Sequence, residues 1–391
     1  MIRRDSTVRP HLDELAKKLG FNFHTIDGEV YWDESRYYQF TLKQIEEHLE
    51  AATNEINQMF LKLVDEVVQS DELLDKLEVP HNLRTWVKRS WKKQDKTLYG
   101  RMDFAYDGKN PPKLLEMNGQ TPTSIYEAAY FQWVWLQEQV DAGKLPASTD
   151  QFNSIQEKLI DRFYAIYEDM EDKETVMYFA SCKGSSEDKA TVDYLRDCAH
   201  QAGLQTAFIY VDDIGLAFEP ETCFTDLEHN IIRNLFMLYP WEHAFEDTYG
   251  KYLSLVDMHF FEPPWKVLLN KGILPLLWER YPNHPNLLPA YFVGEEKEDL
   301  GDHFVTKPVH SREGANITIL DSGEVVEAVE GDYGNHTMVA QKFYSLPKFG
   351  DDYTLIGSWV IGDKACGLTI REDDTAVTKD TSRFVPHVII G

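Results

Sequence analysis

Residues 99–131 read YGRMDFAYDGKNPPKLLEMNGQTPTSIYEAAYF, and this stretch decides how the chain is interpreted. It is predicted to form a strand, a turn at DGKNPP, a second strand, a short loop and a helix. Side chains alternate along a strand, so Arg101 and Asp103 share one face of the first strand, while Glu116 and Asn118 share one face of the second. A hairpin can therefore bring Asp103 beside Glu116 and Asn118.

The polar face of this hairpin predicts a metal site. Two carboxylates and an amide oxygen are hard donors, the ligand set that Mg²⁺ prefers when phosphate oxygens complete its octahedron. The alternative is a solvated strand face, which carboxylates alone would favour. The compact arrangement of Asp103 with Glu116 and Asn118 favours the metal.

The segment after the hairpin is predicted to bind an anion. Ser124-Ile-Tyr-Glu127 matches a capping box, which predicts a helix that begins at Ser124 and turns its amide end toward the hairpin. The N–H groups there, with the hydroxyls of Thr121, Thr123 and Ser124, suit a carboxylate or phosphate. The alternative is that these residues only cap the helix.

Nucleotide contacts are expected nearer the C-terminus. VTKPVHSREGANI sets Lys307 on a strand before a turn with Gly314, which could place a cation and backbone amides over phosphates. Lys266, in EPPWKVLLNKGILPLLW, is a second candidate phosphate ligand. The segment from Gln341 to Tyr344 could offer backbone hydrogen bonds and an apolar wall to adenine, although MVAQKFY would serve equally as a core strand.

A charged cluster follows at residues 370–387, IREDDTAVTKDTSRFVPH. An arginine there can brace the charge that develops on a transferring phosphoryl group, and Arg371 is the candidate. The alternative is an ordinary solvated loop.

The rest of the chain predicts a fold that is α+β or mixed α/β, with a helical N-terminal portion. Residues 41–90 have helical apolar spacing, with Pro80 where a helix would begin. Residues 175–211 form a strand, helix and parallel strand, and the link CKGSSED lacks the glycine pattern of a dinucleotide site, which argues against a nicotinamide cofactor. From about residue 303 short strands with turns indicate an antiparallel sheet, including a hairpin at GDK.

Composition narrows the function classes. The chain has 39 basic and 66 acidic side chains and a net charge of −27, so nucleic acid and anionic membranes are poor partners. No stretch resembles a signal peptide or a membrane span, and the protein is expected to be cytoplasmic. The four cysteines form no CxxC pair, so neither a disulfide framework nor a thiolate metal site is indicated.

Several motifs together resemble one known family. These motifs are, in chain order, GRMDF…LLEMNGQTPTSIYEAAYFQW, EPPWKVLLNKGILPLLW, KPVHSREGANI, QKFYSLPKF and IGSWVIGDKACGLTIREDD…SRFVPH. They are similar, in the same order, to the synthetase part of the glutathionylspermidine synthase family, which has an ATP-grasp fold. The resemblance spans nearly the full chain. It implies a mainly helical portion at 1–97, the hairpin with a pre-ATP-grasp-like parallel unit at 98–260, and an ATP-grasp nucleotide-binding portion at 261–391.

The resemblance also implies roles for individual residues. Mg²⁺ is expected at Asp103, Glu116 and Asn118, and ATP at Lys266, Lys307, Gly314, Gln341 and Tyr344. Arg101 and Arg371 are expected to steady the transferring phosphate. Thr121, Thr123 and Ser124 are expected beside the acid substrate, and bifunctional members of the family have Ser, Ser and Cys at these three positions. Arg101 is expected beside the acid as well. No amidase domain is expected, because only about 100 residues precede the hairpin.

The expected reaction is ATP- and Mg²⁺-dependent ligation of a carboxylic acid to an amine. ATP would convert the carboxylate to an acyl phosphate, which the amine then attacks. In the family the acid is glutathione and the amine is spermidine; for this chain glutathione or another small peptide and a polyamine-like amine are expected. The alternatives are a silent ATP- or polyamine-binding protein and a kinase that releases a stable phosphorylated product. The oligomeric state and the exact substrates lie beyond these motifs.

Overall fold

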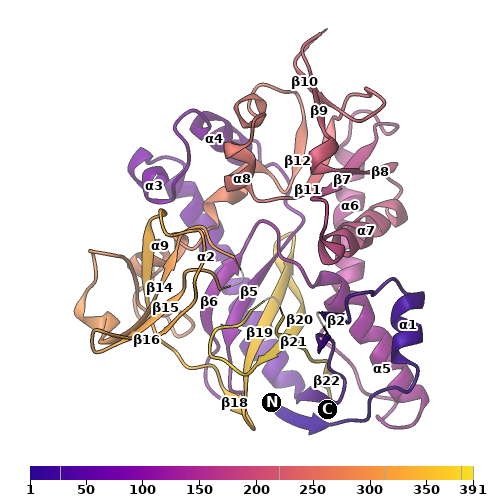
Figure 1. Ribbon diagram of the computed structural model, residues 1–391, viewed down its shortest axis with the longest axis vertical. Helices are drawn as coiled ribbons and strands as arrows, with labels where there is room; N and C mark the ends of the chain where they lie inside the picture. Colours follow the sequence, from indigo (N-terminus) through magenta and orange to yellow (C-terminus); the bar gives the residue numbers. More distant parts are fainter. Residues whose placement is uncertain (27, 220, 313, 380, 391) are drawn as a thin grey trace.

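The central sheet carries the predicted hairpin. The computed structural model describes residues 1–391 except 27, 220, 313, 380 and 391. The sheet runs in the order β21-β20-β19-β5-β6, and β18 also pairs with β19 (Figure 1). Its strands are β5 Tyr99–Ala105, β6 Lys113–Asn118, β18 Lys348–Phe349, β19 Asp352–Ile361, β20 Lys364–Asp373 and β21 Arg383–Phe384. The turn predicted at GDK is confirmed, since Gly362 and Asp363 join β19 to β20.

A second sheet is antiparallel, as the C-terminal pattern predicts. Its order is β13-β17-β14-β15-β16. Its strands are β13 Ala290–Phe292, β14 His303–Pro308, β15 Thr318–Asp321, β16 Glu324–Ala328 and β17 Met338–Lys342. This sheet stands beside the hairpin in Figure 1, so β14 and β17 can present side chains toward β6.

A third sheet is parallel and contains the predicted strand–helix–strand unit. Its order is β12-β11-β7-β8. The elements are β7 Met177–Ser181, α7 Ser186–Gln201, β8 Thr206–Tyr210, β11 Asn234–Leu238 and β12 His259–Phe261. Ser185 caps α7 by accepting the backbone N–H of Asp188, and Gly203 ends the turn after it with φ +98°. The prediction for residues 175–211 is confirmed.

Helices pack around these sheets. They are α1 Leu12–Lys18, a π-helical segment Gln44–Glu50, α2 Ala51–Val67, α3 Asp71–Lys76, α4 Arg84–Lys92, a π-helical segment Glu127–Phe131, α5 Gln132–Asp141, α6 Ile155–Asp169, α8 Trp241–Glu246 and α9 Ile273–Arg280. Short 3₁₀ segments lie at Val211–Asp213, Gly250–Tyr252, Pro264–Leu268 and Glu298–Leu300. Helices occupy most of residues 41–90 as predicted. Pro80 does not begin one, because it opens a turn in which Leu83 N–H bonds its carbonyl, and α4 starts only at Arg84.

The two ends of the chain meet in a small sheet of order β1-β4-β22. Its strands are β1 Ile2–Asp5, β4 Arg36–Phe40 and β22 His387–Ile389, and Figure 1 shows the N and C marks close together there. Two further pairs are β2 Thr25–Ile26 with β3 Glu29–Val30, and β9 Gly215–Ala217 with β10 Cys223–Thr225.

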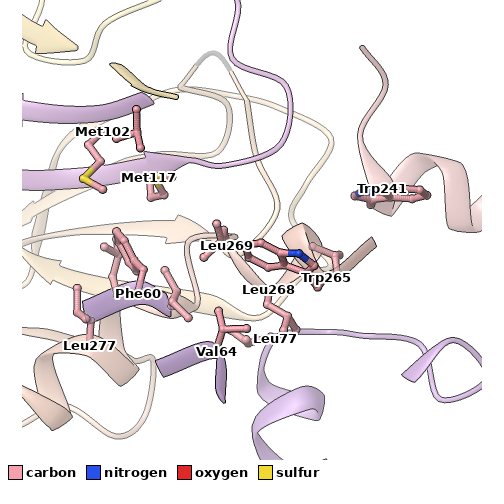
Figure 2. Close-up of a cluster of buried hydrophobic side chains, with 14 of the residues drawn as sticks. Phe60, Val64, Leu77, Met102, Met117, Trp241, Trp265, Leu268, Leu269 and Leu277 are labelled. Carbon is pink, nitrogen blue, oxygen red and sulfur yellow. The ribbon is translucent and has the colours of Figure 1, made fainter. Parts of the chain in front are cut away.

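A large hydrophobic core connects the three main sheets with α2 and α9. It includes Phe60 of α2, Met102 of β5, Leu235 of β11, Leu277 of α9 and Ile356 of β19. Figure 2 shows Phe60, Met102 and Leu277 within this cluster. The division at 97 and 260 therefore stays a prediction, because buried apolar side chains bridge all three segments. Among the described residues, no helix combines the length and apolar character needed to cross a membrane.

Candidate functional site

The polar face of the hairpin has the predicted register. Asp103 pairs with Glu116 across β5 and β6, and Arg101 pairs with Asn118. Asn118 Nδ2 donates to Asp103 Oδ2 at 2.9 Å and to Glu116 Oε1 at 3.2 Å. The structure therefore brings the three predicted metal ligands into mutual contact.

Arg101 is held rigidly beside them. Its Nε and Nη2 donate to the two carboxylate oxygens of Asp103 at 2.7 and 3.0 Å, and its Nη1 donates to the carbonyl of Thr123 at 3.0 Å. Gly357 on β19 lies underneath, and a Cβ there would come within 2.7 Å of Arg101 Cδ. The glycine thus leaves room for a buried guanidinium that links the hairpin to the Thr121–Ser124 loop.

Two lysines flank Glu116 on its other side. Lys271 Nζ lies 3.3 Å from Glu116 Oε2 and donates to the carbonyl of Ser311 at 2.7 Å. Lys307 Nζ, on β14, donates to the carbonyl of Leu115 at 2.9 Å. Burial alone would raise the pKa of Glu116, but the attraction of Lys271 and Lys307 brings it down to about 2. Glu116 is therefore an anion at neutral pH, as a metal ligand must be.

These groups line one large cavity of about 610 Å³. Its wall also includes the predicted residues Gly314, Gln341, Tyr344 and Arg371. This volume lies in the usual range of sites for small organic ligands. Most of the residues proposed from sequence thus share one space.

The expected ATP residues are positioned in different ways. Gly314 has φ +77°, and a Cβ there would lie 2.9 Å from Val377, so the loops at 311–316 and 374–379 touch beside the cavity. Gln341 lies inside β17 and its backbone pairs with strands on both sides, while its side chain donates to the carbonyl of Leu114 at 3.2 Å. Tyr344 is 36% exposed beyond the strand. In the segment from Gln341 to Tyr344, the side chain with accessible surface is therefore Tyr344, beyond the end of β17.

A second corner of the cavity combines acid, base and hydroxyl groups. Arg312 Nη1 donates to Thr121 Oγ1 at 2.7 Å, and Arg312 Nη2 lies 3.3 Å from Glu242 Oε1. Within the described part of the chain, Glu242 Oε2, Arg312 Nε and Ser311 Oγ are buried without hydrogen-bond partners. Buried polar atoms are normally paired, so hydrogen-bonding atoms without partners in one corner indicate space for a polar ligand.

Ser124 departs from its prediction. It is 1% exposed, has φ +71°, and does not belong to the cavity wall, while its Oγ has no hydrogen-bond partner among the residues described. Glu127 does not return to cap it, because Glu127 Oε1 accepts the hydroxyl of Tyr31 at 2.7 Å. The predicted capping box is wrong, and Arg101, Thr121 and Thr123 are the members of the predicted acid pocket that reach the cavity.

Lys266 also departs from its prediction. It is 3% exposed, and its Nζ lies 2.9 Å from Glu262 Oε2 and donates to the carbonyl of Tyr99 at 2.7 Å. It lies outside the wall of the main cavity and lines a different one. The structure therefore assigns Lys266 to a buried ion pair, and Lys271, five residues later, takes the position beside Glu116.

The donor set at the hairpin fits Mg²⁺ with phosphate oxygens as its remaining ligands. In the described ranges, no three His, Cys, Asp or Glu side chains cluster as a metal cage. Mg²⁺ usually binds through one or two carboxylates and substrate phosphates, not an all-protein cage, and Asp103 with Glu116 supply that pair.

Other residues in the cavity were not predicted. Lys271 and Arg312 lie inside motifs that were recognised, but nothing in their spacing set them apart. Glu242 from α8, with Glu187 and Asp188 from the first turn of α7, adds carboxylates to the wall. These three come from segments without a catalytic pattern, so only the fold brings them together.

Comparisons with known proteins agree with this geometry. A Haemophilus influenzae protein named "Putative acid--amine ligase" is 39% identical over 98% of both chains. The trypanothione synthetase of Crithidia fasciculata is 27% identical over 84% of this chain and 53% of its own. The Escherichia coli bifunctional glutathionylspermidine synthetase/amidase is 24% identical over 93% of this chain and 61% of its own. This chain thus spans about half to three fifths of the latter two proteins.

The fold has a solved counterpart. A glutathione synthetase-like effector from Globodera pallida, in its apo form, superposes with a TM-score of 0.56 at 11% identity over 98% of both chains, which confirms the predicted mixed α/β fold. The family model described as "Glutathionylspermidine synthase preATP-grasp" matches residues 3–390. The chain therefore belongs to the glutathionylspermidine synthase family.

Proposed function

We propose that this protein is an ATP-dependent ligase that joins a carboxylic acid to an amine through an acyl phosphate. Membership of the family and 39% identity to a protein named as an acid–amine ligase support the reaction class. The observation that carries the proposal is a single cavity whose wall combines the Asp103–Glu116 carboxylate pair with the cations Arg101, Lys271, Lys307 and Arg371. Such a wall suits a triphosphate with its metal.

Each group has a place in the proposed reaction. Asp103, Glu116 and Asn118 would hold Mg²⁺, which offsets phosphate charge when it is bound. Lys271 and Lys307 would hold the phosphates. Arg101 and Arg371 would stabilise the charge on the γ-phosphoryl group as an oxygen of the acid attacks phosphorus and ADP leaves.

The second step forms the amide. The amine nitrogen attacks the carbonyl carbon of the acyl phosphate, inorganic phosphate leaves, and the nitrogen loses a proton. Glu187 and Asp188 line the cavity, so their carboxylates are suited to attract a cationic amine and to accept that proton. The proposed acid is glutathione or another small peptide, held by Arg312 and the loop with Thr121 and Thr123; the proposed amine is a polyamine.

The test is an incubation of the protein with ATP, Mg²⁺, glutathione and spermidine, then with wider acid and amine panels, followed by mass spectrometry. One amide and one ADP per turnover would support the proposal. A stable phosphorylated product that is released without any amide, even when amine is present, would replace it with a kinase. Tight ATP binding without any product would replace it with a nucleotide-binding protein.

The matched control is Glu116→Gln, which keeps the shape of the side chain but removes its charge. At the Mg²⁺ concentration that is half-maximal for the wild type, it should form far less product than the wild type. If this variant turned over as fast as the wild type, the activity would not depend on the proposed site.

A further inference from the structure

A second cavity, also about 610 Å³, lies against the opposite side of the hairpin. Its wall is built from α2, α4, residues 94–100, the 3₁₀ segment Pro264–Leu268 and the turn at Gly362. Met117 and Leu269 line both cavities, and the Met117 side chain points to the face of β6 opposite Glu116 and Asn118. Figure 2 shows Phe60, Met117, Leu269 and Trp265 gathered along this wall. The two cavities are therefore neighbours with different chemistry.

Buried hydrogen-bond donors are available in this second cavity. Lys266 lines it, and the ammonium carries three N–H groups but has two partners, Glu262 and the carbonyl of Tyr99, among the described residues. Asn57, 6% exposed on α2, also lines it, and its Nδ2 lacks a partner in the described structure. Two unused donors in a buried wall require an acceptor from outside the chain.

The charge of the wall favours an anion. The whole chain has a net charge of −27, yet this wall holds five cations and three anions. The cations are Lys88, Lys92, Lys96, Arg162 and Lys266, and the anions are Asp65, Asp95 and Asp363. Ion pairs to Asp71 and Asp169 hold Lys88 and Lys96 at the rim. Lys266 is paired in the same way with Glu262, so Lys92 and Arg162 are the wall cations for which the described residues supply no ion pair, and these two would attract an anionic group.

Two indole rings add an apolar surface. Trp91 and Trp265 meet edge to face with centroids 4.8 Å apart. Trp91 Nε1 donates to Asp65 at 2.6 Å, and Trp265 Nε1 donates to the carbonyl of Asp95 at 3.2 Å. Because both N–H groups are used, these residues offer a ligand only their apolar ring surface.

We propose that this cavity is a second binding site, for a small organic anion whose carboxylate or phosphate monoester is attached to a flat apolar body. The anionic group bonds Lys266 and Asn57, and the apolar body packs on Trp91 and Trp265. Glu262 accepts the N–H groups of Leu98 and Tyr99 at 2.9 and 2.8 Å, so the site adjoins the start of the strand that carries Arg101 and Asp103. The inference does not depend on the ligase reaction.

The test uses saturation-transfer NMR with benzoate and phenyl phosphate as probes and neutral benzamide as the uncharged control. Both anions should bind, benzamide should not, and the stronger anion identifies the preferred headgroup. Asn57→Asp replaces the unused donor with a negative charge of equal shape and should weaken binding at least tenfold. Asn54→Asp is the matched control on α2, because Asn54 lies outside this wall and its Oδ1 accepts Ala365 N–H, which aspartate can still do.

Two more variants decide the location. Lys307→Met alters the main cavity only. That cavity is itself proposed to hold carboxylates and phosphates, so this variant should at most remove a separate component of anion binding and should leave the component that Asn57→Asp weakens. Lys92→Glu, at an exposed rim position, should weaken binding several-fold even if Asn57→Asp does not fold. Wild-type affinity in folded Asn57→Asp, equal binding of benzamide, or complete loss of anion binding in Lys307→Met would each overturn the proposal. So would unchanged affinity in Lys92→Glu.

Discussion

Arg101 and Asp103 form a two-point ion pair on one face of β5, with Nε–Oδ1 and Nη2–Oδ2 distances of 2.7 and 3.0 Å. The pair fixes the Asp103 carboxylate so that Asn118 can bridge it to Glu116. Arg101 also holds the carbonyl of Thr123, so one buried cation joins the proposed metal ligands to the loop of the proposed acid pocket.

Replacing Glu116 tests the metal site without breaking that ion pair. Glu116→Gln removes one of two charged ligands and leaves Lys271 and Lys307 without their carboxylate. We expect the Mg²⁺ concentration for half-maximal turnover to rise on the order of 100-fold, as losses of metal-site groups typically produce. Titration of Mg²⁺ at fixed ATP measures this. Glu324→Gln, an exposed strand position, is the control, and an unchanged Mg²⁺ requirement in Glu116→Gln would refute the ligand role.

Variants of Lys266 and Lys271 should separate a loss of stability from a loss of nucleotide binding. Lys266→Met leaves the Glu262 charge buried and unpaired, so the free energy of unfolding should fall by about 3–5 kcal/mol. Lys271→Met removes a cation from the main cavity and should weaken ATP binding by about tenfold with a smaller cost in stability. Denaturant unfolding and ATP titration of each variant check both expectations. Loss of ATP binding in a fully stable Lys266→Met protein would restore the assignment made from sequence.

The difference between these two lysines shows what local patterns can predict. Strand parity is a local rule, and it correctly placed Asp103 opposite Glu116, because the side-chain period along a strand is two. Both lysines occur in one motif and both contact the hairpin, but Lys266 lies in the 3₁₀ segment Pro264–Leu268 and Lys271, just after it, is the one that lines the main cavity. That difference depends on packing against Glu262 and β5, which no spacing reveals.

The loop before α5 shows a second limit. Ser124 and Glu127 have the spacing of a capping box, but Glu127 bonds Tyr31, which lies 96 residues away in the chain. A tertiary hydrogen bond has displaced the local one. Glu242 and Arg312 likewise meet only because α8 and the loop after β14 converge on the cavity.

Lys307 should make ATP binding depend on pH. Burial lowers the pKa of Lys307 to about 8, although Glu116 acts to raise it. Below this pKa the ammonium can pair with phosphate, and above it the charge is lost, so the Kd for ATP should rise from pH 7 to 9. The rise should approach about tenfold per pH unit above the pKa, because one proton is involved. Lys307→Arg stays charged throughout and should flatten the profile. Calorimetric titration at constant ionic strength measures both proteins, and parallel profiles would rule out Lys307 as the titrating group.

Glu127 should make stability fall with rising pH. Burial, and then the nearby charge of Glu187, raise the pKa of Glu127 to about 8, against the lowering influence of Tyr31 and Arg371. The folded protein therefore holds a proton that the unfolded chain releases near pH 4.5. Below that pH both states are protonated and nothing is lost. Between there and pH 8 the free energy of unfolding falls, and above pH 8 the full loss of a few kcal/mol remains, at about 1.4 kcal/mol per pKa unit.

Glu127→Gln isolates this contribution. Glutamine keeps an oxygen that can accept the Tyr31 hydroxyl but cannot ionise, so its stability should decline less between pH 5 and 8 than that of the wild type. Urea unfolding at several pH values gives the difference in the free energy of unfolding between the two proteins. Titrating groups that both proteins share cancel in this difference, and Glu372, whose pKa is raised to about 7, is one of them. Glu219→Gln, an exposed position, should follow the wild type. If Glu127→Gln and the wild type lose stability in parallel, the Glu127 carboxyl is already ionised in the folded protein at neutral pH, and another group carries the pH dependence.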